Sequence, residues 1–273
     1  MISDWQQHLD EAHKERVRRL GLLTGLRYEK AGGFRPANFE RALVLQRIMT
    51  LRRPARILEL GTGRGLGALA MADMARELGI TCEITSVDIL PPTAPQWWPI
   101  EVDGQQEERR ASIDEIWGKH IEVELRQRVL LRTGPTTAVL PALAAEGRKF
   151  DFIFIDAGHD LYSVVHDLSY SAALLDKDGA ILMDDFAPLE EFGLGTCIAL
   201  SHARRWFGHV ETITTEGVIY GGAVFPDAPR GMIFLKDLRE KHVRVRRSSL
   251  LWWRVAGAIL GRCYRPGLFP LTR

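Results

Sequence analysis

The sequence is poor in cysteine, and its cysteines are placed unlike those of a disulfide scaffold. Only Cys82, Cys197 and Cys263 occur in 273 residues, far apart and odd in number. This usage is typical of a reducing compartment, and no Cys/His spacing indicates a zinc site. The N-terminus has no apolar segment of the signal-peptide kind. We therefore expect a cytoplasmic protein.

Acidic residues are absent from 241–273, which hold 8 of the 36 Lys and Arg and none of the 35 Asp and Glu. Residues 1–240 then carry 28 basic and 35 acidic residues, a net charge of −7. Phosphate binding needs a basic face, so this acidic body argues against nucleic acid as the main partner.

The apolar segment 250–260 within this tail is too short to span a bilayer, which takes about 20 apolar residues. The adjacent tryptophans 252 and 253 and the flanking arginines suit a membrane interface, which 241–263 would then contact peripherally. The alternative is a C-terminal helix packed on the domain or across a homo-oligomer.

The remaining composition, 46% hydrophobic and 26% charged, is ordinary for a globular protein with a sizeable core. From residue 56, short apolar runs alternate with helical segments. Strands are predicted at 56–61, 82–88, 128–134, 150–158 and 180–185, with helices at 66–78, 136–147, 162–176 and 195–207. Strands that are apolar on both faces and alternate with helices indicate a doubly wound α/β sheet. Two further strands, 209–215 and 231–237, are expected to form an antiparallel pair at one sheet edge.

The chain is predicted to have three parts. Residues 1–50 form an N-terminal helical cap, with helices at 4–24 and 38–50. Residues 51–240 form the α/β domain, and 241–273 form the basic and apolar tail. Within the domain, 91–126 is an insertion expected to be an ordered loop followed by a helix, and long ordered loops are usually functional. Its Trp97 and Trp98, with Phe34 and Arg35, either wall a substrate pocket or anchor the insertion to the core.

A glycine-rich turn in "ILELGTGRGLG" (57–67) joins the first strand of the sheet to a helix. Gly61, Gly63 and Gly65 allow a sharp turn and close approach to a ligand, and the helix start offers unpaired N–H groups. Asp88 ends the next strand, where a carboxylate can accept both hydroxyls of a ribose. Residues 63–68 also fit a relaxed dinucleotide pattern, but the nearby carboxylate of Glu59 would repel pyrophosphate and suits a cationic ligand.

Three aspartates end neighbouring strands. Asp156 ends the fourth strand, and Asp184 and Asp185 end the fifth, "AILMDD". Parallel strands finish at the same sheet edge, where open α/β sheets bind ligands. Three carboxylates there repel one another unless they share a cation, and oxygen ligands favour Mg²⁺ or Mn²⁺. Successive strand residues point to opposite faces, so Asp184 and Asp185 can share an ion only if the chain bends. Otherwise one of them caps the next helix and the other is solvated.

His159 follows Asp156 by three residues, on the loop above the same edge. An imidazole there can take the proton from a substrate hydroxyl, because its pKa lies near neutrality. The alternatives are a loop histidine that only forms hydrogen bonds, or catalysis by a metal-bound aspartate or the metal alone. His166 and Asp167 are expected on the following helix, in a structural role.

The segment Glu59-Leu60-Gly61-Thr62-Gly63-Arg64-Gly65 resembles the first motif of class I S-adenosylmethionine-dependent methyltransferases, and "SVDI" with Asp88 resembles their ribose-binding motif. The stretch from "FIDAGHDLYSVVHDL" to "LLDKDGAILMDDF" is similar to the subgroup related to macrolide-sugar and catechol-type O-methyltransferases. The resemblance covers about 30–235 and implies a Rossmann-like, seven-stranded sheet with a reversed last strand and helices on both faces. After the third strand, Thr133-Gly134-Pro135-Thr136 replaces the family's Gly-Asp, which favours backbone contacts to the adenine.

The resemblance implies methyl transfer from S-adenosylmethionine to the hydroxyl of a small molecule, assisted by Mg²⁺ or Mn²⁺. The cofactor would contact Glu59, Gly61, Thr62, Gly63, Gly65, Asp88, Thr133 and Gly134. The metal ligands would be Asp156, Asp184 and Asp185, and the catalytic residues His159 and Asp156. Two alternatives are a nicotinamide-dependent oxidoreductase and a non-catalytic, membrane-peripheral binding protein.

Overall fold

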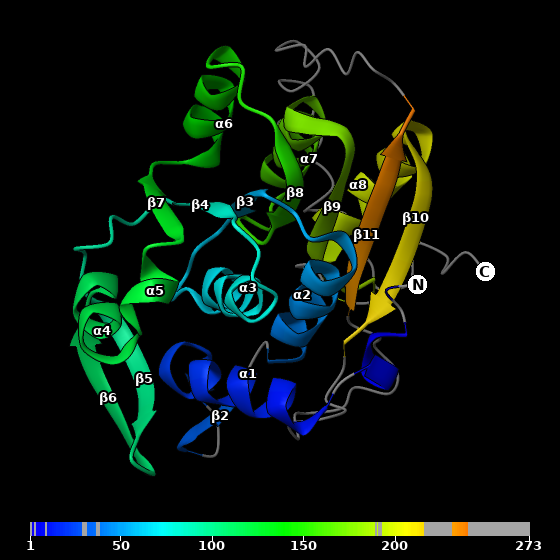
Figure 1. Cartoon of the computed structure of the whole chain (residues 1–273). Coiled ribbons are helices and arrows are strands. Elements are labelled where there is room, and N and C mark those ends of the chain that lie inside the picture. Colours follow the sequence, from blue (N-terminus) through cyan, green and yellow to red (C-terminus); the bar gives the residue numbers. More distant parts are fainter. Residues whose placement is uncertain are drawn as a thin grey trace. The chain divides into compact units, whose positions relative to one another are not determined.

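The computed structural model describes residues 2, 4–8, 10–28, 32–36, 39–188, 190, 193–215 and 231–239. Asn38, the first residue of the predicted helix 38–50, and the tail 241–273 lie outside them. The described chain forms a seven-stranded sheet in the order β10-β11-β9-β8-β3-β4-β7 (Figure 1). Its strands are β3 (Arg56–Leu60), β4 (Glu83–Asp88), β7 (Val129–Thr133), β8 (Phe150–Ile155), β9 (Leu175–Phe186), β10 (Phe207–Thr214) and β11 (Gly231–Leu238). The predicted Rossmann-like α/β class is confirmed.

Helices alternate with these strands as the sequence predicts. They are α1 (Glu11–Thr24), α2 (Phe39–Arg52), α3 (Leu66–Glu77), α4 (Ile113–His120), α5 (Val123–Arg126), α6 (Thr136–Ala145), α7 (Leu161–Leu174) and α8 (Leu194–Trp206). Among the described helices, none is both long and apolar enough to cross a membrane. The chain divides into two compact units. Of the described residues, the first unit comprises those within 2–55 and 62–134 together with Thr215, and the second comprises those within 56–61, 135–214 and 231–239.

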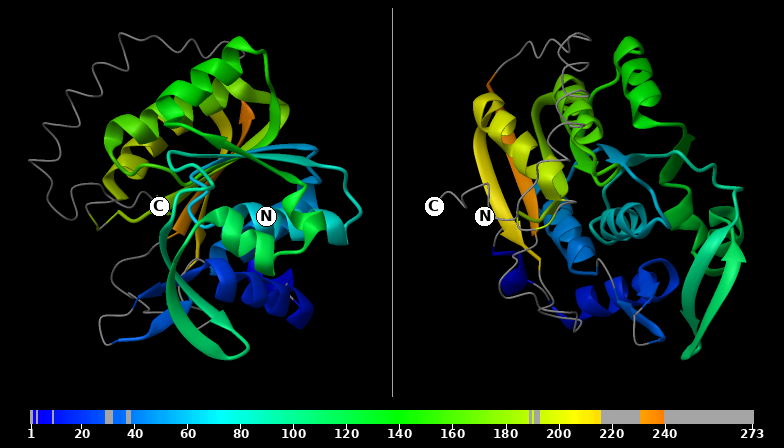
Figure 2. Two further views of the ribbon diagram at one scale, coloured as in Figure 1. Left: turned by 90° about the vertical axis from the view of Figure 1, so that its left-hand side faces the viewer. Right: turned by 180° about the vertical axis from the view of Figure 1, so that it is seen from behind.

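In the second unit, β3, β8 and β9 run parallel and in register at their carboxyl ends. Leu60 pairs with Ile155, and Ile155 pairs with Met183. The strands are apolar on both sides because both faces are covered, and Ile57, Phe152 and Ile181 are fully buried. Helices α6, α7 and α8 lie side by side on one face of β8 and β9 (Figure 2). The pair β10–β11 is antiparallel, and β11 is also antiparallel to β9, so the predicted antiparallel edge is confirmed.

One arginine joins the amino-terminal ends of β3, β8 and β9. The Arg56 guanidinium donates to Asp151 at 2.9 Å and to Asp176 at 2.5 Å, and the Arg56 backbone N–H donates to Asp151 at 2.8 Å. The hydrogen bonds that Arg56 donates to the Asp151 and Asp176 carboxylates raise the pKa of its guanidinium. These three residues, Arg56, Asp151 and Asp176, are called the charged clasp. The clasp lies at the amino-terminal ends of the strands, whereas the predicted acidic site lies at their carboxyl ends.

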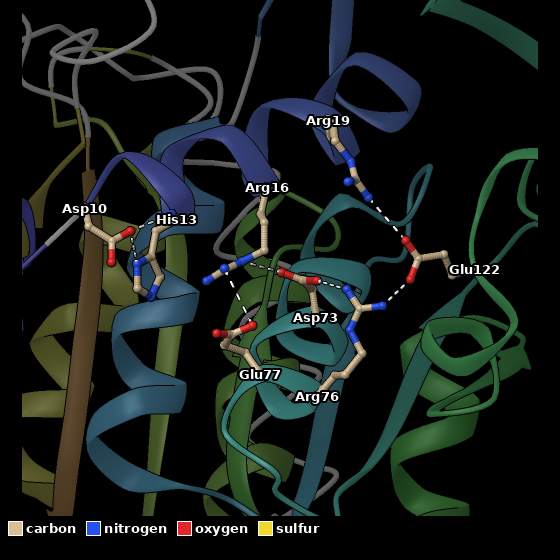
Figure 3. A network of polar contacts seen from close by, with 8 residues as sticks. All are labelled: Asp10, His13, Arg16, Arg19, Asp73, Arg76, Glu77 and Glu122. Carbon is tan, nitrogen blue, oxygen red and sulfur yellow. Dashed lines mark hydrogen bonds and ion pairs between the residues drawn. The ribbon is translucent and has the colours of Figure 1, made fainter.

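In the first unit, β4 and β7 are parallel, α3 packs on both, and α1 contacts α2 and α3 (Figure 1). A polar network joins α1, α3 and the residue before α5 (Figure 3). At its centre Asp73 is 3% exposed and pairs with Arg16 at 3.2 Å and Arg76 at 2.7 Å. Burial raises the pKa of Asp73, and the charges of Arg76 and Arg16 oppose that rise. Glu122 completes the network by binding Arg76 and Arg19.

Two segments differ from their predicted form. The N-terminal helix expected at 4–24 is a short 3₁₀ turn, η1 (Trp5–His8), followed by α1, because Asp10 caps α1 by accepting from the His13 N–H at 2.8 Å. Between the two predicted N-terminal helices, β1 (Leu26–Tyr28) and β2 (Phe34–Pro36) form a small antiparallel pair.

The insertion 91–126 is a β-hairpin followed by α4 and the short α5, not a loop followed by a single helix. Strands β5 (Gln96–Val102) and β6 (Gln105–Ala111) are joined by Asp103 and Gly104, both with positive φ (52° and 74°). A two-residue Asp-Gly turn of this kind matches the twist of an antiparallel pair. Trp98 anchors the hairpin, since it is fully buried and its indole donates to the Leu23 carbonyl at 2.7 Å, whereas Trp97 is 64% exposed.

Candidate active site

The glycine-rich turn of the first unit is tied to the end of β4. The Thr62 hydroxyl bonds with that of Ser86 at 2.6 Å, and the Gly63 N–H donates to Oδ2 of Asp88 at 2.8 Å. Oδ1 of Asp88 accepts from the Leu90 N–H at 2.9 Å. Each carboxylate oxygen has a second lone pair. Asp88 is therefore held in place with capacity to accept two further hydroxyl groups.

The end of β7 lies beside this carboxylate. Thr133 is the register partner of Asp88, and the Gly134 N–H donates to the Asp88 carbonyl at 2.8 Å. Gly134 has a φ of +145°, which favours glycine. In the first unit, therefore, the residues predicted for the ribose and the adenine lie together at the ends of β4 and β7.

In the second unit, the first glycine of the motif lies against the first predicted metal ligand. Gly61 has a φ of +94°, and a Cβ there would lie 2.0 Å from the carbonyl oxygen of Asp156. The Asp156 N–H donates to the Leu60 carbonyl at 2.8 Å, which continues the pairing of β3 with β8. Glu59, two residues before Gly61 on β3, is 1% exposed. Only a glycine allows the turn to pass this close to Asp156.

The three predicted aspartates come together. One carboxylate oxygen from each of Asp156, Asp184 and Asp185 lies within 4.8 Å of the others, and Asp184 is 8% exposed. The bend that the sequence requires lies at Asp185 itself, whose φ is +57°. This left-handed conformation, which Asp tolerates better than most residues, places two consecutive side chains at one cluster. Neither residue caps α8, which begins after Gly193 without a side-chain cap.

His159 contacts this acidic cluster. Its Nδ1 lies 2.8 Å from Oδ2 of Asp185, and its side chain is 52% exposed. An ionised carboxylate can only accept, so Nδ1 carries the hydrogen and Nε2 is the basic nitrogen of the neutral ring. The predicted base therefore lies beside the cluster, in contact with Asp185.

His166 and Asp167 lie on α7, as predicted, and are nearly inaccessible at 3% and 0% exposure. Nδ1 of His166 is 3.1 Å from Oδ1 of Asp167, and Tyr170 packs on the imidazole with a centroid distance of 4.7 Å. Burial raises the pKa of Asp167, while hydrogen bonds from His166 and Thr136 oppose the rise. The pair joins α7 to the start of α6.

Residues 58–186 match the family model described as a methyltransferase domain. This range contains the glycine-rich turn, Asp88, the acidic cluster and His159. The match falls on the segment that carries the resemblance to class I S-adenosylmethionine-dependent methyltransferases, and that resemblance is confirmed over this range.

Individual relatives agree with this assignment. The chain is 26% identical over 181 residues to the O-methyltransferase hkm8 of Aspergillus hancockii, a match that covers 65% of this chain and 56% of that protein. The chain thus spans little more than half of that relative's length.

Solved structures share the fold. An O-methyltransferase from Bacillus cereus in complex with SAH aligns over 87% of this chain and all of that one, with a TM-score of 0.52 and 17% identity. The SAH-bound Podospora anserina methyltransferase PaMTH1 aligns over 86% of this chain and 92% of that one, with a TM-score of 0.51 and 19% identity.

Proposed function

We propose that the protein transfers the methyl group of S-adenosylmethionine to a hydroxyl oxygen of a small molecule, with a divalent cation at Asp156, Asp184 and Asp185. One observation carries the proposal. Gly61, from the cofactor motif, lies against the backbone of Asp156, from the acidic cluster, at adjacent carboxyl ends of β3 and β8. The relative hkm8 is an O-methyltransferase, which supports oxygen as the acceptor atom.

Cofactor binding is assigned to two groups of residues. Asp88 would accept the two ribose hydroxyls with the lone pairs that Gly63 and Leu90 leave available. The buried carboxylate of Glu59 favours a cationic ligand such as the sulfonium cofactor over a pyrophosphate. The remaining assigned contacts are those of Gly61, Thr62 and Gly65, and the backbone contacts of Thr133 and Gly134 to the adenine.

The acidic cluster fits a hard divalent cation. Its donors are all carboxylate oxygens, they come from two adjacent strands, and the left-handed Asp185 directs a third carboxylate to the same place. Three carboxylates within 4.8 Å of one another repel strongly unless a cation is shared. Mg²⁺ and Mn²⁺ prefer such oxygen donors. A cation bound there supplies charge stabilisation and a lower pKa for the acceptor hydroxyl.

Residues of the chain would then remove the proton of the acceptor hydroxyl. His159 accepts the hydroxyl proton at Nε2, and Asp185 holds the N–H of Nδ1 and stabilises the imidazolium that forms. Methyl transfer would form the bond from the acceptor oxygen to the methyl carbon and break the bond from that carbon to the sulfonium sulfur, leaving S-adenosylhomocysteine with a neutral sulfur.

The first experiment is a binding comparison followed by an activity assay. Isothermal titration of the full chain with S-adenosylhomocysteine and with NADH should give binding to the first alone. Transfer of labelled methyl from S-adenosylmethionine to catechol, sugar and polyketide acceptors should require Mg²⁺ or Mn²⁺ and stop with EDTA. Binding of NADH instead would support an oxidoreductase. Liposome binding that needs 241–273, with no methyl transfer, would support a membrane-peripheral binding protein.

The metal assignment has a matched pair of variants. Asp184→Asn removes a charge from the cluster, whereas Asp178→Asn makes the same change at an exposed position of β9. We expect Asp184→Asn to lower kcat at least a hundredfold with S-adenosylhomocysteine affinity unchanged, and Asp178→Asn to change neither. Full activity of Asp184→Asn in the presence of EDTA would refute the metal assignment.

A further inference from the structure

The Arg64–Gly65 end of the glycine-rich turn is held by a residue of the insertion. Trp117, on α4, is 4% exposed, and its indole N–H donates to the Arg64 carbonyl at 3.2 Å. Its ring also lies directly over Gly65, where a Cβ would lie 2.0 Å from Cζ2 of the indole. The same side chain therefore fixes one peptide carbonyl and covers the next residue, which begins α3 with a φ of +96°.

A second contact to the same end comes from the N-terminal segment. Nη2 of Arg64 donates to the carbonyl oxygen of Leu26, in β1, at 2.6 Å. Burial of the guanidinium, and secondarily the charge of Arg27, lowers the pKa of Arg64 to about 10. Placing a guanidinium in a buried position is unfavourable unless its contacts compensate. The hydrogen bond to Leu26 thus fixes the position of the Arg64 side chain against β1.

The two holding segments are themselves anchored. A reciprocal capping box of Ser112 and Glu115 fixes the start of α4, which carries Trp117. The preceding hairpin is fastened to the end of α1 by the bond from Trp98 to the Leu23 carbonyl. The glycine-rich turn is therefore held by contacts with two segments outside the glycine motif, through Trp117 of the insertion and Leu26 of the N-terminal segment.

We propose that Trp117 and Arg64 are positioning residues that keep Thr62–Gly65 in the conformation that binds S-adenosylmethionine. This inference rests on the proposed function. A turn with glycine at 63 and 65 has wide conformational freedom, and ordering it opposes binding. When only a fraction of the molecules holds the competent conformation, the apparent Kd rises by the inverse of that fraction. The insertion 91–126 then serves cofactor affinity, whatever else it contributes to acceptor binding.

The test measures S-adenosylhomocysteine binding to the full chain by titration calorimetry and stopped-flow fluorescence. Trp117→Phe removes the indole N–H and the part of the ring that covers Gly65. We expect the Kd to rise about tenfold, the scale of one lost buried hydrogen bond. The rise should come from slower association with dissociation unchanged, because the bound complex still has the ordered turn. The control Trp97→Phe makes the same change on the same insertion at a 64% exposed site and should leave Kd within twofold.

A second pair keeps the test decisive should Trp117→Phe not fold. Arg64→Met removes the bond to Leu26 and should also raise Kd about tenfold, whereas Arg64→Lys keeps a donor on a long side chain and should restore most of the affinity. Near-UV circular dichroism confirms folding of each variant. Folded Trp117→Phe and Arg64→Met proteins that bind within twofold of the wild type would overturn the inference. A wild-type protein that does not bind S-adenosylhomocysteine would instead refute the proposed function.

Discussion

Replacing Gly61 by alanine should destabilise the protein far more than the same change at Gly63. Both residues have positive φ, +94° and +54°. An L-residue in the left-handed region loses about 1 to 2 kcal/mol. At Gly63 nothing lies within 4 Å of the added Cβ, so this loss of about 1 to 2 kcal/mol is the whole effect.

At Gly61 a steric term is added. The new Cβ would lie 2.0 Å from the carbonyl oxygen of Asp156 and 2.6 Å from its carbonyl carbon. These are backbone atoms, and the bond from Asp156 N–H to the Leu60 carbonyl limits their movement. Overpacking of a fixed neighbour typically costs about 1 to 3 kcal/mol. We therefore expect Gly61→Ala to lower the free energy of unfolding by about 2 to 5 kcal/mol.

The assay is urea unfolding monitored by circular dichroism. The two variants and the wild type are analysed with the same dependence of the unfolding free energy on urea concentration. Because relief of the clash would displace Asp156, Gly61→Ala should also weaken Mg²⁺ binding, and Gly63→Ala should not. Equal destabilisation of the two variants, within about 0.5 kcal/mol, would show that the contact with Asp156 is not what demands glycine at 61.

Three further predictions concern charged side chains. His159→Gln should lower kcat by about 10² to 10⁴ with unchanged S-adenosylhomocysteine affinity, and a wild-type rate would exclude the base role. Arg76→Ala should destabilise the fold by about 2 to 4 kcal/mol in urea because Asp73 stays buried with one cation fewer, whereas Arg18→Ala, at an exposed pair, should change stability by less than about 0.5 kcal/mol. Burial raises the folded-state pKa of Asp167 above 3.8, so the folded protein binds this proton more tightly than the unfolded chain. The free energy of unfolding of the wild type, relative to that of Asp167→Asn, should therefore fall as pH rises from 3.8 through the folded-state pKa and level off above it. The measurement is urea unfolding of both proteins across this pH range. A difference that stays constant or grows would contradict the raised pKa of Asp167.

The sheet was predictable because its strands are apolar on both faces and separated by helical periods. The acidic cluster was predictable for a related reason, since residues after parallel strands must meet at one edge. The left-handed φ of Asp185 was not predictable, because no side-chain pattern marks it. The sequence argument required a bend near Asp184 and Asp185, and the structure supplies it one residue earlier than Phe186-Ala187-Pro188 suggested.

The hairpin of the insertion was missed although a signal for it is present. Asp103-Gly104 is a strong two-residue turn sequence, but β6, "QQEERRA", lacks the apolar alternation that identifies a strand. The contact between Trp117 and Gly65 has no such signal. The two residues lie in segments far apart in the sequence, and only the folded hairpin and the capped α4 place the indole on the turn.

The charged clasp of Arg56 and the acidic cluster occupy opposite ends of β8. Asp151 and Asp156 are five strand residues apart, which corresponds to about 16 Å at about 3.3 Å per residue. Two Debye lengths at physiological ionic strength amount to about the same distance. Because the charged groups at both ends are partly exposed to solvent, the effect of charge changes at the clasp on the other end should be strongly screened. Directed evolution can therefore change thermal stability through Asp151 and Asp176 without shifting the pKa values of the acidic cluster and His159, on which methyl transfer would depend.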